Sequence, residues 1–343
     1  MKNRIYIIAL LVLAGLTSCE NDSWEFPDYE FQTVYFAYQY PIRTITLGED
    51  IFDTTLDNEG KAVIMATTGG TYNNPQDVLI DVQVNNSLVD GLLFEENGSP
   101  VQAMPQSYYT LAADQIMIPK GELIGGVEFQ LTDAFFEDEQ AIGRNYVIPL
   151  EMTNVMSADS ILSGVPLMAG ARKPVAEDWD VVPKDFILYA VKYVNPWHGN
   201  YLRRGVDVIE GTPGNEDLDD TVVRREEYVV DDEVTSLTTT ALEDVSLDLV
   251  FQNSEGYAVN CTLILSFDDS GNCTVSAASE DYTASGSGQF VKDGEENSWG
   301  GKDRNALYLD YQVNLEEITV STQDTLVLRD RGVTMETFSP VLE

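Results

Sequence analysis

Aromatic and basic side chains coincide at two places in the second half of the chain. They are Trp197, Tyr201 and Arg203 in NPWHGNYLRR, and Trp299, Lys302 and Arg304 in NSWGGKDR. Sugar recognition uses an aromatic face for the C–H surface of the ring and planar donors for its hydroxyls. These six residues are therefore the predicted ligand-binding residues, and a glycan is the predicted ligand. The alternative is that the aromatics close a barrel end or a domain interface, while the arginines pair with surface acids.

The other reactive side chains form no recognisable catalytic or metal-binding motif. His198 is the one histidine, and no G-x-S-x-G sequence accompanies it. Without a cysteine pair at ligand spacing, a zinc site of the usual kind is not expected. The acidic turns at 217–220, 268–272 and 293–297 do not match the twelve-residue calcium loop. We expect no enzyme activity, no metal and no cofactor, although the many carboxylates leave a glycosidase pair open.

The charge balance limits the partners of the protein. The chain has 58 acidic and 19 basic residues and a formal net charge of −39. This balance excludes a strongly basic surface for nucleic acid. The hydrophobic fraction of 43% is ample for packed cores, so the acidity belongs to the surface.

The N-terminus has the pattern of a secretory signal. Lys2 and Arg4 precede an apolar run at 5–13, which is too short for a transmembrane helix of ~20 residues. The following LTSC resembles a bacterial lipoprotein box, in which the cysteine is diacylated and becomes the mature N-terminus. Residues 1–18 are therefore the predicted signal peptide and Cys19 the lipidation site, so that the membrane contact is made through a lipid anchor only.

Acidic residues follow this cysteine directly. Glu20, Asp22 and Glu25 lie within a predicted acidic tether at 19–31. Their charge does not favour anionic headgroups, so the tether should stand off the membrane. The acidic stretch also resembles the surface-export signal of Bacteroidota lipoproteins. This predicts an outer-membrane protein that faces the exterior, with a periplasm-facing anchor as the alternative.

Residues 32–164 alternate apolar and polar side chains between turn-rich segments. VLIDVQV at 78–84, GGVEFQL at 125–131 and YVIPLEM at 146–152 are the clearest examples. Short half-buried strands at this spacing are typical of an immunoglobulin-like β-sandwich. Residues 165–183 contain three prolines and little periodicity, which predicts a linker.

Residues 184–343 contain roughly eight further strands in sequence. Many are hairpin-linked, and long helices are absent, so we expect an all-β chain that ends in an antiparallel, lipocalin-like β-barrel or in a second sandwich. CTLILSFDDSGNCTVSA predicts a hairpin that pairs Phe267 with Cys273. Cys261 then lies roughly 20 Å away along the strand, too far for a disulfide, and both cysteines should be buried thiols.

The complete layout resembles a group of two-domain surface lipoproteins of Bacteroidota. Besides the lipoprotein box, the resemblance lies in YYTL, QIMIPKGELIGGVEFQL, YVIPLEMTNVMSADSILSG and the closing DTLVLRDRGV. The N-terminal, immunoglobulin-like domain of that group has unknown function and recurs in polysaccharide-utilisation loci. The resemblance supplies no catalytic residues. It implies a non-catalytic surface lipoprotein that binds glycans as an accessory of polysaccharide uptake, or alternatively an adhesin or structural module that contacts surface proteins.

Overall fold

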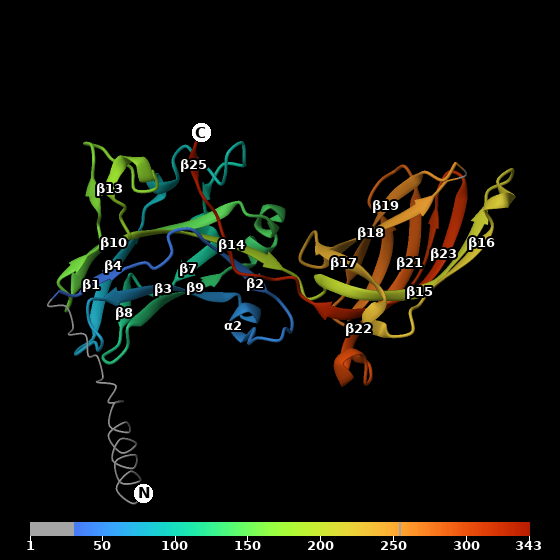
Figure 1. The fold of residues 1–343 in the computed structure, drawn as a ribbon, viewed down its shortest axis with the longest axis horizontal. Helices are drawn as coiled ribbons and strands as arrows, with labels where there is room; N and C mark the ends of the chain where they lie inside the picture. The colour runs from blue at the N-terminus through green and yellow to red at the C-terminus, as the bar shows by residue number, and fades with distance from the viewer. Residues whose placement is uncertain (1–30, 254) are drawn as a thin grey trace, which may run out of the picture.

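The protein is all-β and consists of two bodies placed end to end. The structure is a computed structural model that describes residues 31–253 and 255–343. Strands make up 52% of it and helices 10%. Figure 1 shows layered sheets at one end and a barrel at the other. The predicted fold class, an all-β chain in which a sandwich precedes an antiparallel barrel, is confirmed.

The N-terminal body has two layers that share one pairing path. One layer contains β1 (Thr33–Tyr35), β3 (Lys61–Gly69), β9 (Ile124–Leu131) and β7 (Tyr109–Leu111). The other contains β8 (Gln115–Ile118), β4 (Val78–Val84), β10 (Tyr146–Met156), β14 (Phe186–Val194) and β2 (Pro41–Thr46). The layers join where Met117 of β8 pairs with Gly126 of β9. We call this body the sandwich.

Side-chain alternation builds the core of the sandwich. Val78 and Ile80 of β4 share one buried cluster with Ile64 of β3 and Phe129 of β9. Each such side chain stabilises the fold by ~1.5–3 kcal/mol. At the join between the layers, a Cβ on Gly125 would lie 2.0 Å from the carbonyl oxygen of Met117. A glycine is therefore required where the two layers approach this closely.

Short elements complete the two bodies. The α-helices are α2 (Thr55–Asn58) and α3 (Asp133–Phe136). The 3-10 turns are Asn86–Val89, Gln106–Tyr108, Glu139–Ile142, Ala176–Asp178, Glu216–Leu218, Val229–Asp231 and Trp299–Gly301. The short strands are β5 (Leu92–Leu93), β6 (Gln102–Ala103), β11 (Ser160–Ile161), β12 (Val165–Pro166), β13 (Trp179–Val181), β24 (Glu336–Thr337) and β25 (Val341–Leu342).

The boundary expected at residue 184 is wrong, because β14 belongs to the sandwich. It lies between β10 and β2 and pairs with both. Its two faces are buried in different clusters, with Ile187 and Val191 in one and Phe186 and Leu188 in the other. The sequence of a strand that is covered on both faces is a continuous apolar run. Such a run does not indicate the domain to which the strand belongs.

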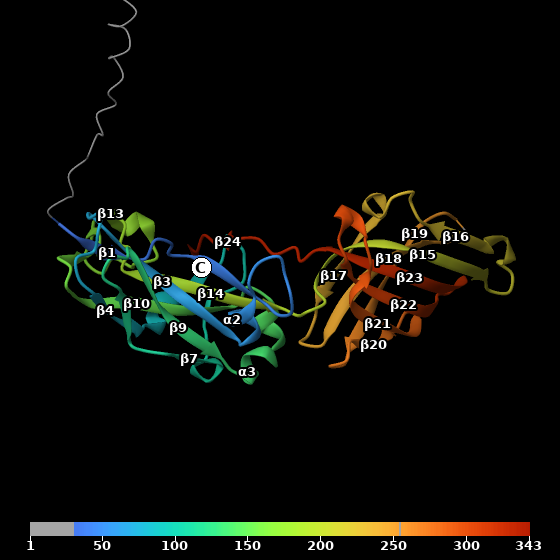
Figure 2. The ribbon, with the colours of Figure 1, turned by 90° about the horizontal axis from the view of Figure 1, so that it is seen from below.

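Both ends of the expected C-terminal domain therefore change. The barrel begins after Asn195, and the segment 165–183, expected as a linker, includes the hairpin of β12 and β13. The last residues return to the sandwich, where β24 pairs with β2 and β25 with β5. Figure 2 shows this red segment running from the barrel back along the sandwich. Two chain segments thus connect the bodies.

The C-terminal body is a closed antiparallel barrel of eight strands, which decides between the barrel and the second sandwich. The strands are β15 (Gly199–Gly211), β17 (Glu233–Thr239), β18 (Asp244–Gln252), β19 (Ala258–Phe267), β20 (Asn272–Ala277), β21 (Thr283–Glu295), β22 (Arg304–Asn314) and β23 (Ile318–Asp330). A further strand, β16 (Asp220–Arg224), pairs with the second half of β15.

The cysteine hairpin has the predicted register. Phe267 pairs with Cys273, and Leu265 with Val275. Both thiols are free and buried in the barrel core. Burial raises the pKa of Cys261 to about 11 and that of Cys273 to about 12.

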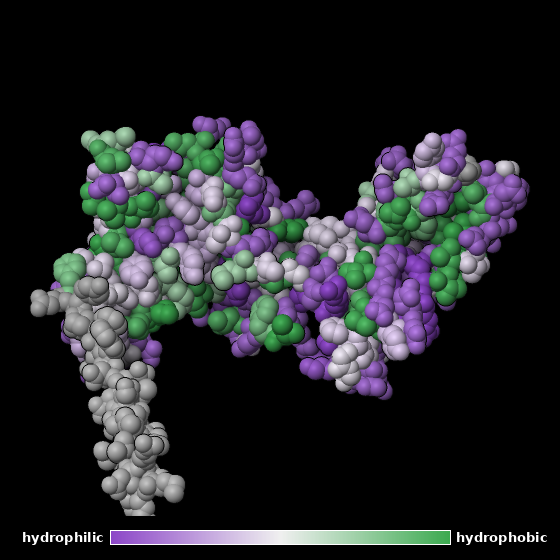
Figure 3. Space-filling model, viewed as in Figure 1, coloured by the Kyte–Doolittle hydropathy of each residue, from purple (hydrophilic) through white to green (hydrophobic). Residues whose placement is uncertain are grey.

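The surface of the two bodies is mixed in polarity. Figure 3 shows hydrophobic areas on the sandwich and on the barrel, bordered by hydrophilic residues. Among the residues that the structure describes, no helix has the length and apolar character needed to cross a bilayer.

We expect neither barrel thiol to react while the protein is folded. In the chain 20–343, which lacks Cys19, maleimide at pH 8 should modify no cysteine in buffer and both cysteines in denaturant without reductant. Cys261 and Cys273 are only 2% and 3% exposed, and their raised pKa values leave little reactive thiolate. Mass spectrometry counts the adducts, and a Cys261–Cys273 disulfide would contradict the register.

Candidate functional site

Two of the six predicted ligand-binding residues close the barrel end that faces the sandwich. The Trp197 ring stacks on Phe267, with centroids 4.1 Å apart and planes inclined by 9°. Tyr201 is fully buried, and its hydroxyl donates to the carbonyl oxygen of Trp197 at 2.7 Å. The ligand-binding role predicted for Tyr201 is therefore wrong, because its ring is fully buried. Trp197 is partly buried and uses one ring face in packing.

Arg203 lies inside the barrel and is 6% exposed. Its Nε donates to Asp324 at 2.9 Å, and its Nη2 donates to the hydroxyl of Tyr311 at 3.1 Å. Arg224 adds ion pairs to Asp207 and Asp324. Removing one partner from such a buried network would leave an uncompensated charge, so Arg203 has a structural role.

Of the other three predicted residues, Trp299 and Lys302 lie on the connection between β21 and β22, and Arg304 is the first residue of β22. The guanidinium of Arg304 lies 3.5 Å from the centroid of the Trp299 ring. The indole Nε1 donates to the carbonyl oxygen of Leu328 at 3.3 Å, while Lys302 is exposed. One face of Trp299 is thus covered by Arg304, and the other face remains for packing or for a ligand.

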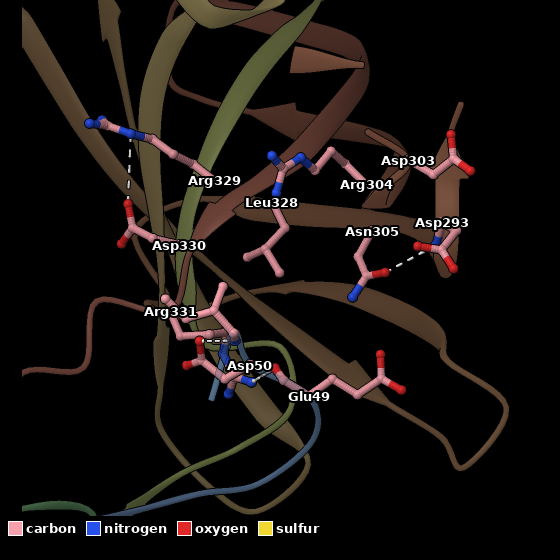
Figure 4. Close-up of a pocket in the computed structure, with 11 residues that line it drawn as sticks. Glu49, Asp50, Asp293, Asp303, Arg304, Asn305, Leu328, Arg329, Asp330 and Arg331 are labelled. Atoms are coloured by element: carbon pink, nitrogen blue, oxygen red, sulfur yellow. Dashed lines mark hydrogen bonds and ion pairs between the residues drawn. The ribbon is translucent and has the colours of Figure 1, made fainter. Parts of the chain in front are cut away.

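Arg304 also lines a pocket between the sandwich and the barrel, which we call the junction pocket (Figure 4). Its volume is about 250 Å³. The sandwich contributes Glu49, Asp50 and Ile51, and the barrel contributes Asp293, Asp303, Arg304, Asn305, Leu328, Arg329, Asp330 and Arg331. Trp299 and Lys302 do not line it. The junction pocket is the candidate functional site.

One buried arginine holds the two walls of the junction pocket together. Arg331 is 3% exposed, and burial lowers its pKa. Its guanidinium donates to the carbonyl oxygens of Leu47 at 3.0 Å and Glu49 at 2.8 Å, in the sandwich. It also donates to those of Asn195 at 2.6 Å and His198 at 2.7 Å, where the chain enters the barrel.

Hydrogen bonds orient the polar side chains of the pocket. The Asn305 Oδ1 accepts from the backbone N–H of Asp293 at 3.0 Å, and Figure 4 shows the pair at one edge of the pocket. No hydrogen bond from the Asn305 amide nitrogen occurs among the described residues, so that donor is free for a ligand. Asp330 accepts from the side chain of Asn200 at 2.7 Å. These contacts fix the side chains before any ligand binds.

The pocket is chemically suited to an uncharged, hydroxyl-rich ligand. Arg304, Arg329 and Asn305 supply planar donors, and the surrounding carboxylates supply acceptors. Leu328 and the 99% exposed Ile51 add apolar surface. In residues 31–253 and 255–343, no group of three or more His, Cys, Asp or Glu side chains is placed to hold a metal ion.

His198 stands beside this site and is held neutral. Its Nδ1 accepts from the backbone N–H of Thr239 at 3.1 Å. Burial lowers its pKa to about 4, with further contributions from the charges of Arg331 and Lys192. The ring therefore acts as a hydrogen-bond acceptor that fixes the entry of the chain into the barrel.

Sequence reasoning missed most of the junction pocket. Glu49–Ile51 follow the strand β2, far from the barrel in sequence, and nothing in their pattern indicates a partner. Arg331 lies in the closing DTLVLRDRGV, where it reads as one more surface charge. Of the residues that line the pocket, the sequence pattern predicts only Arg304, because it follows a tryptophan.

An end-to-end sandwich and eight-stranded barrel define a two-domain all-β class, and the comparisons place the chain within it. A Bacteroides ovatus protein of unknown function, known as a crystal structure, is 50% identical. The match covers 92% of this chain and 100% of that one, with a TM-score of 0.87. The chain belongs to the same family as this protein. The sequence model of a domain of unknown function (DUF5627) matches residues 196–332, and a model described as an N-terminal domain matches 29–159.

More distant structures are less informative. A Bacteroides ovatus multidomain protein including DUF1735 is 12% identical, with a TM-score of 0.41 and coverage of 90% of this chain and 100% of that one. A Bacteroides ovatus ATCC 8483 protein whose description names carbohydrate binding is 13% identical, with a TM-score of 0.28 and coverage of 89% and 97%. At these TM-scores neither supports an argument about this chain. No curated protein matches it.

We expect protonation of His198 to destabilise the protein. The folded pKa of about 4 lies below the ordinary histidine value of 6.5, so the unfolded state binds more protons between these values. The stability supplied by the neutral ring is present above pH 6.5 and is lost as the pH falls through 4. The loss should approach about 3 kcal/mol.

The control is His198→Gln, which retains an acceptor for Thr239 and does not titrate. Urea denaturation of both proteins between pH 7 and 4 gives the difference in unfolding free energy. This difference isolates the histidine, because all carboxylates are common to the two proteins. A difference that does not change with pH would show that the ring is not held neutral.

Proposed function

We propose that the protein is a non-catalytic lipoprotein of the outer-membrane surface that binds a glycan in the junction pocket, as an accessory of polysaccharide uptake. The observation that carries the proposal is the convergence of fixed donors, carboxylates and a small apolar surface between the two bodies. Hydroxyl groups both donate and accept, so they match guanidinium and amide donors as well as carboxylate acceptors. Leu328 and Ile51 provide contact for the C–H surface of a sugar ring.

The order of the parts along the chain supports a surface role. Cys19, the expected lipid anchor, lies outside the described residues. Eleven residues lie between it and Phe31, and the twelve steps from Cys19 to Phe31 reach at most about 40 Å. Strand β1 lies at the end of the sandwich that is remote from the barrel (Figure 1). A lipid at Cys19 would therefore hold the sandwich near the membrane and leave the junction pocket farther out.

The second candidate function is that of an adhesin or protein-interaction module. Met65, Met117 and Ile124 lie on neighbouring strands of the sandwich and are 47%, 50% and 54% exposed. Clustered exposed apolar side chains mark protein-contact surfaces. Specific protein capture by this face, without glycan binding, would favour this alternative.

The anchor is tested by Cys19→Ala in the full-length chain. We expect the substitution to abolish palmitate incorporation and either to release the protein from membranes or to leave the precursor uncleaved, because acylation requires the thiol. Metabolic labelling and cell fractionation measure both effects. Surface protease treatment of intact cells separates an exterior from a periplasmic orientation. Unchanged lipid labelling in the variant would overturn the anchor.

The pocket is tested by Arg329→Ala in the soluble chain 20–343. A glycan array first identifies a ligand, and titration calorimetry then compares the variants. Arg329 is half exposed, so its removal should leave the fold intact while weakening glycan binding by about tenfold or more, since a hydrogen bond from a charged group contributes ~1.5–3 kcal/mol. Arg225→Ala, an exposed arginine that follows β16 and does not line the junction pocket, is the matched control. Equal glycan affinity of the two variants would show that the glycan does not bind in the junction pocket.

A further inference from the structure

The barrel wall is closed at the end near the sandwich and split at the other end. The first half of β15 pairs with β17, through Gly199–Arg203, and its second half pairs with β16, through Gly205–Ile209. β17 pairs with β18 only up to Leu247. Among the described residues, no strand pairs with the edge of β16 that faces away from β15, or with residues 248–252 of β18 on the edge opposite β19. We call this interval between β16 and β18 the barrel seam.

A hollow of about 480 Å³ lies in the barrel seam. Val222 and Arg224 of β16 line one side, and Leu249 and Phe251 of β18 line the other. Arg203 contributes to the lining from inside the barrel. This volume lies within the range of ligand sites, and mouths of β-barrels commonly hold such sites.

The two strands that border the seam are unusual for an edge. Each has five residues in this interval, and neither has a proline or a lysine to block pairing. Val223 and Val250 are 64% and 65% exposed beside it. Unpaired N–H and C=O groups on facing edges are a template for an added strand.

The charge around the seam selects the kind of strand. Asp220, Glu233 and Asp248 line the hollow. The positive charges of Arg203 and Arg224 are already compensated by Asp207 and Asp324, and Glu233 pairs with both arginines. Asp220 and Asp248 form no ion pair among the described residues. The Arg224 Nε is buried without a hydrogen-bond partner among the described residues, so a backbone carbonyl could accept from it. The rim therefore attracts cations, while the interior offers apolar contacts and a donor.

We propose that the barrel seam binds an extended basic peptide segment of another protein as an added β-strand. A segment of about five residues spans ~17 Å, which matches the free edges of β16 and β18. Alternate side chains of this segment enter the hollow against Leu249 and Phe251, and basic side chains between them meet Asp220 and Asp248. The proposal does not depend on glycan binding, because the seam lies at the opposite end of the barrel from the junction pocket.

The probe is a fluorescein-labelled heptapeptide of alternating lysine and valine, titrated into the soluble chain 20–343 by fluorescence anisotropy. We expect saturable binding and slower hydrogen–deuterium exchange at residues 220–224 and 248–252. An otherwise identical peptide with N-methylated valines should bind at least tenfold more weakly, because it lacks half of the backbone donors. A peptide of alternating glutamate and valine should not bind.

The matched variants are Asp220→Lys and Asp248→Lys, with Asp310→Lys as the control. Each changes the net charge by the same amount, but Asp310 is exposed on β22, away from the seam. Binding of the lysine–valine peptide should fall at least tenfold in the seam variants and stay near the wild-type value in the control. Equal losses in all three, equal binding of the N-methylated peptide, or no binding at millimolar peptide would each overturn the proposal. The last result would mean that the seam carboxylates only protect an open edge.

Discussion

The arrangement of the two bodies depends on one buried cation. Arg331 has no carboxylate partner among the described residues, and instead donates to four backbone carbonyls. A guanidinium cannot be deprotonated in practice, so its burial is tolerated only while all of these acceptors remain in place. Two of the acceptors follow β2 and two lie between β14 and β15. Any rotation of the barrel against the sandwich would break at least one of these bonds, so the guanidinium holds the junction pocket in one shape.

The barrel interior shows a second use of buried charge. Leu263, Leu265 and Phe267 fill one part with apolar side chains. In the part near the seam, Asp324 accepts from Arg203 and from the Tyr311 hydroxyl, and it also pairs with Arg224. Such a network is seldom more stable than apolar packing would be. The network does, however, make that part of the barrel interior polar.

Much of the fold could be predicted because its strands obey simple periodicity. The alternation in 78–84 and 125–131 marked half-buried strands, and the turn in the cysteine hairpin fixed the pairing of Phe267 with Cys273. The sequence could not assign β14 to the sandwich, because this strand is apolar on both faces. The return of the chain to the sandwich through β24 and β25 could not be predicted either, because a strand of two residues is too short to show an alternating pattern. Local pattern predicts local pairing, and these two features are long-range.

The candidate site could be predicted only in part, for a related reason. Proximity of an aromatic and a cation in sequence indicates that the two side chains can meet, and Trp299 and Arg304 do meet. This proximity in sequence does not indicate whether the two side chains contact a ligand. Trp197 and Tyr201 satisfied the same pattern while closing the barrel. The junction pocket is instead assembled from one loop of the sandwich and three strands of the barrel, and only the fold brings these together.

The acidity of the chain restricts what the junction pocket and the barrel seam can bind. Carboxylates outnumber cations in the junction pocket, and acids that are not matched by free cations line the seam. With a net charge of −39, the surrounding surface adds a repulsive field for anions, which water and salt screen over a Debye length of ~8–10 Å. Polyanionic glycans are therefore disfavoured at the junction pocket, and acidic peptides at the seam. The net charge is thus consistent with the two ligands that we propose, a neutral sugar at one end of the barrel and a basic segment at the other.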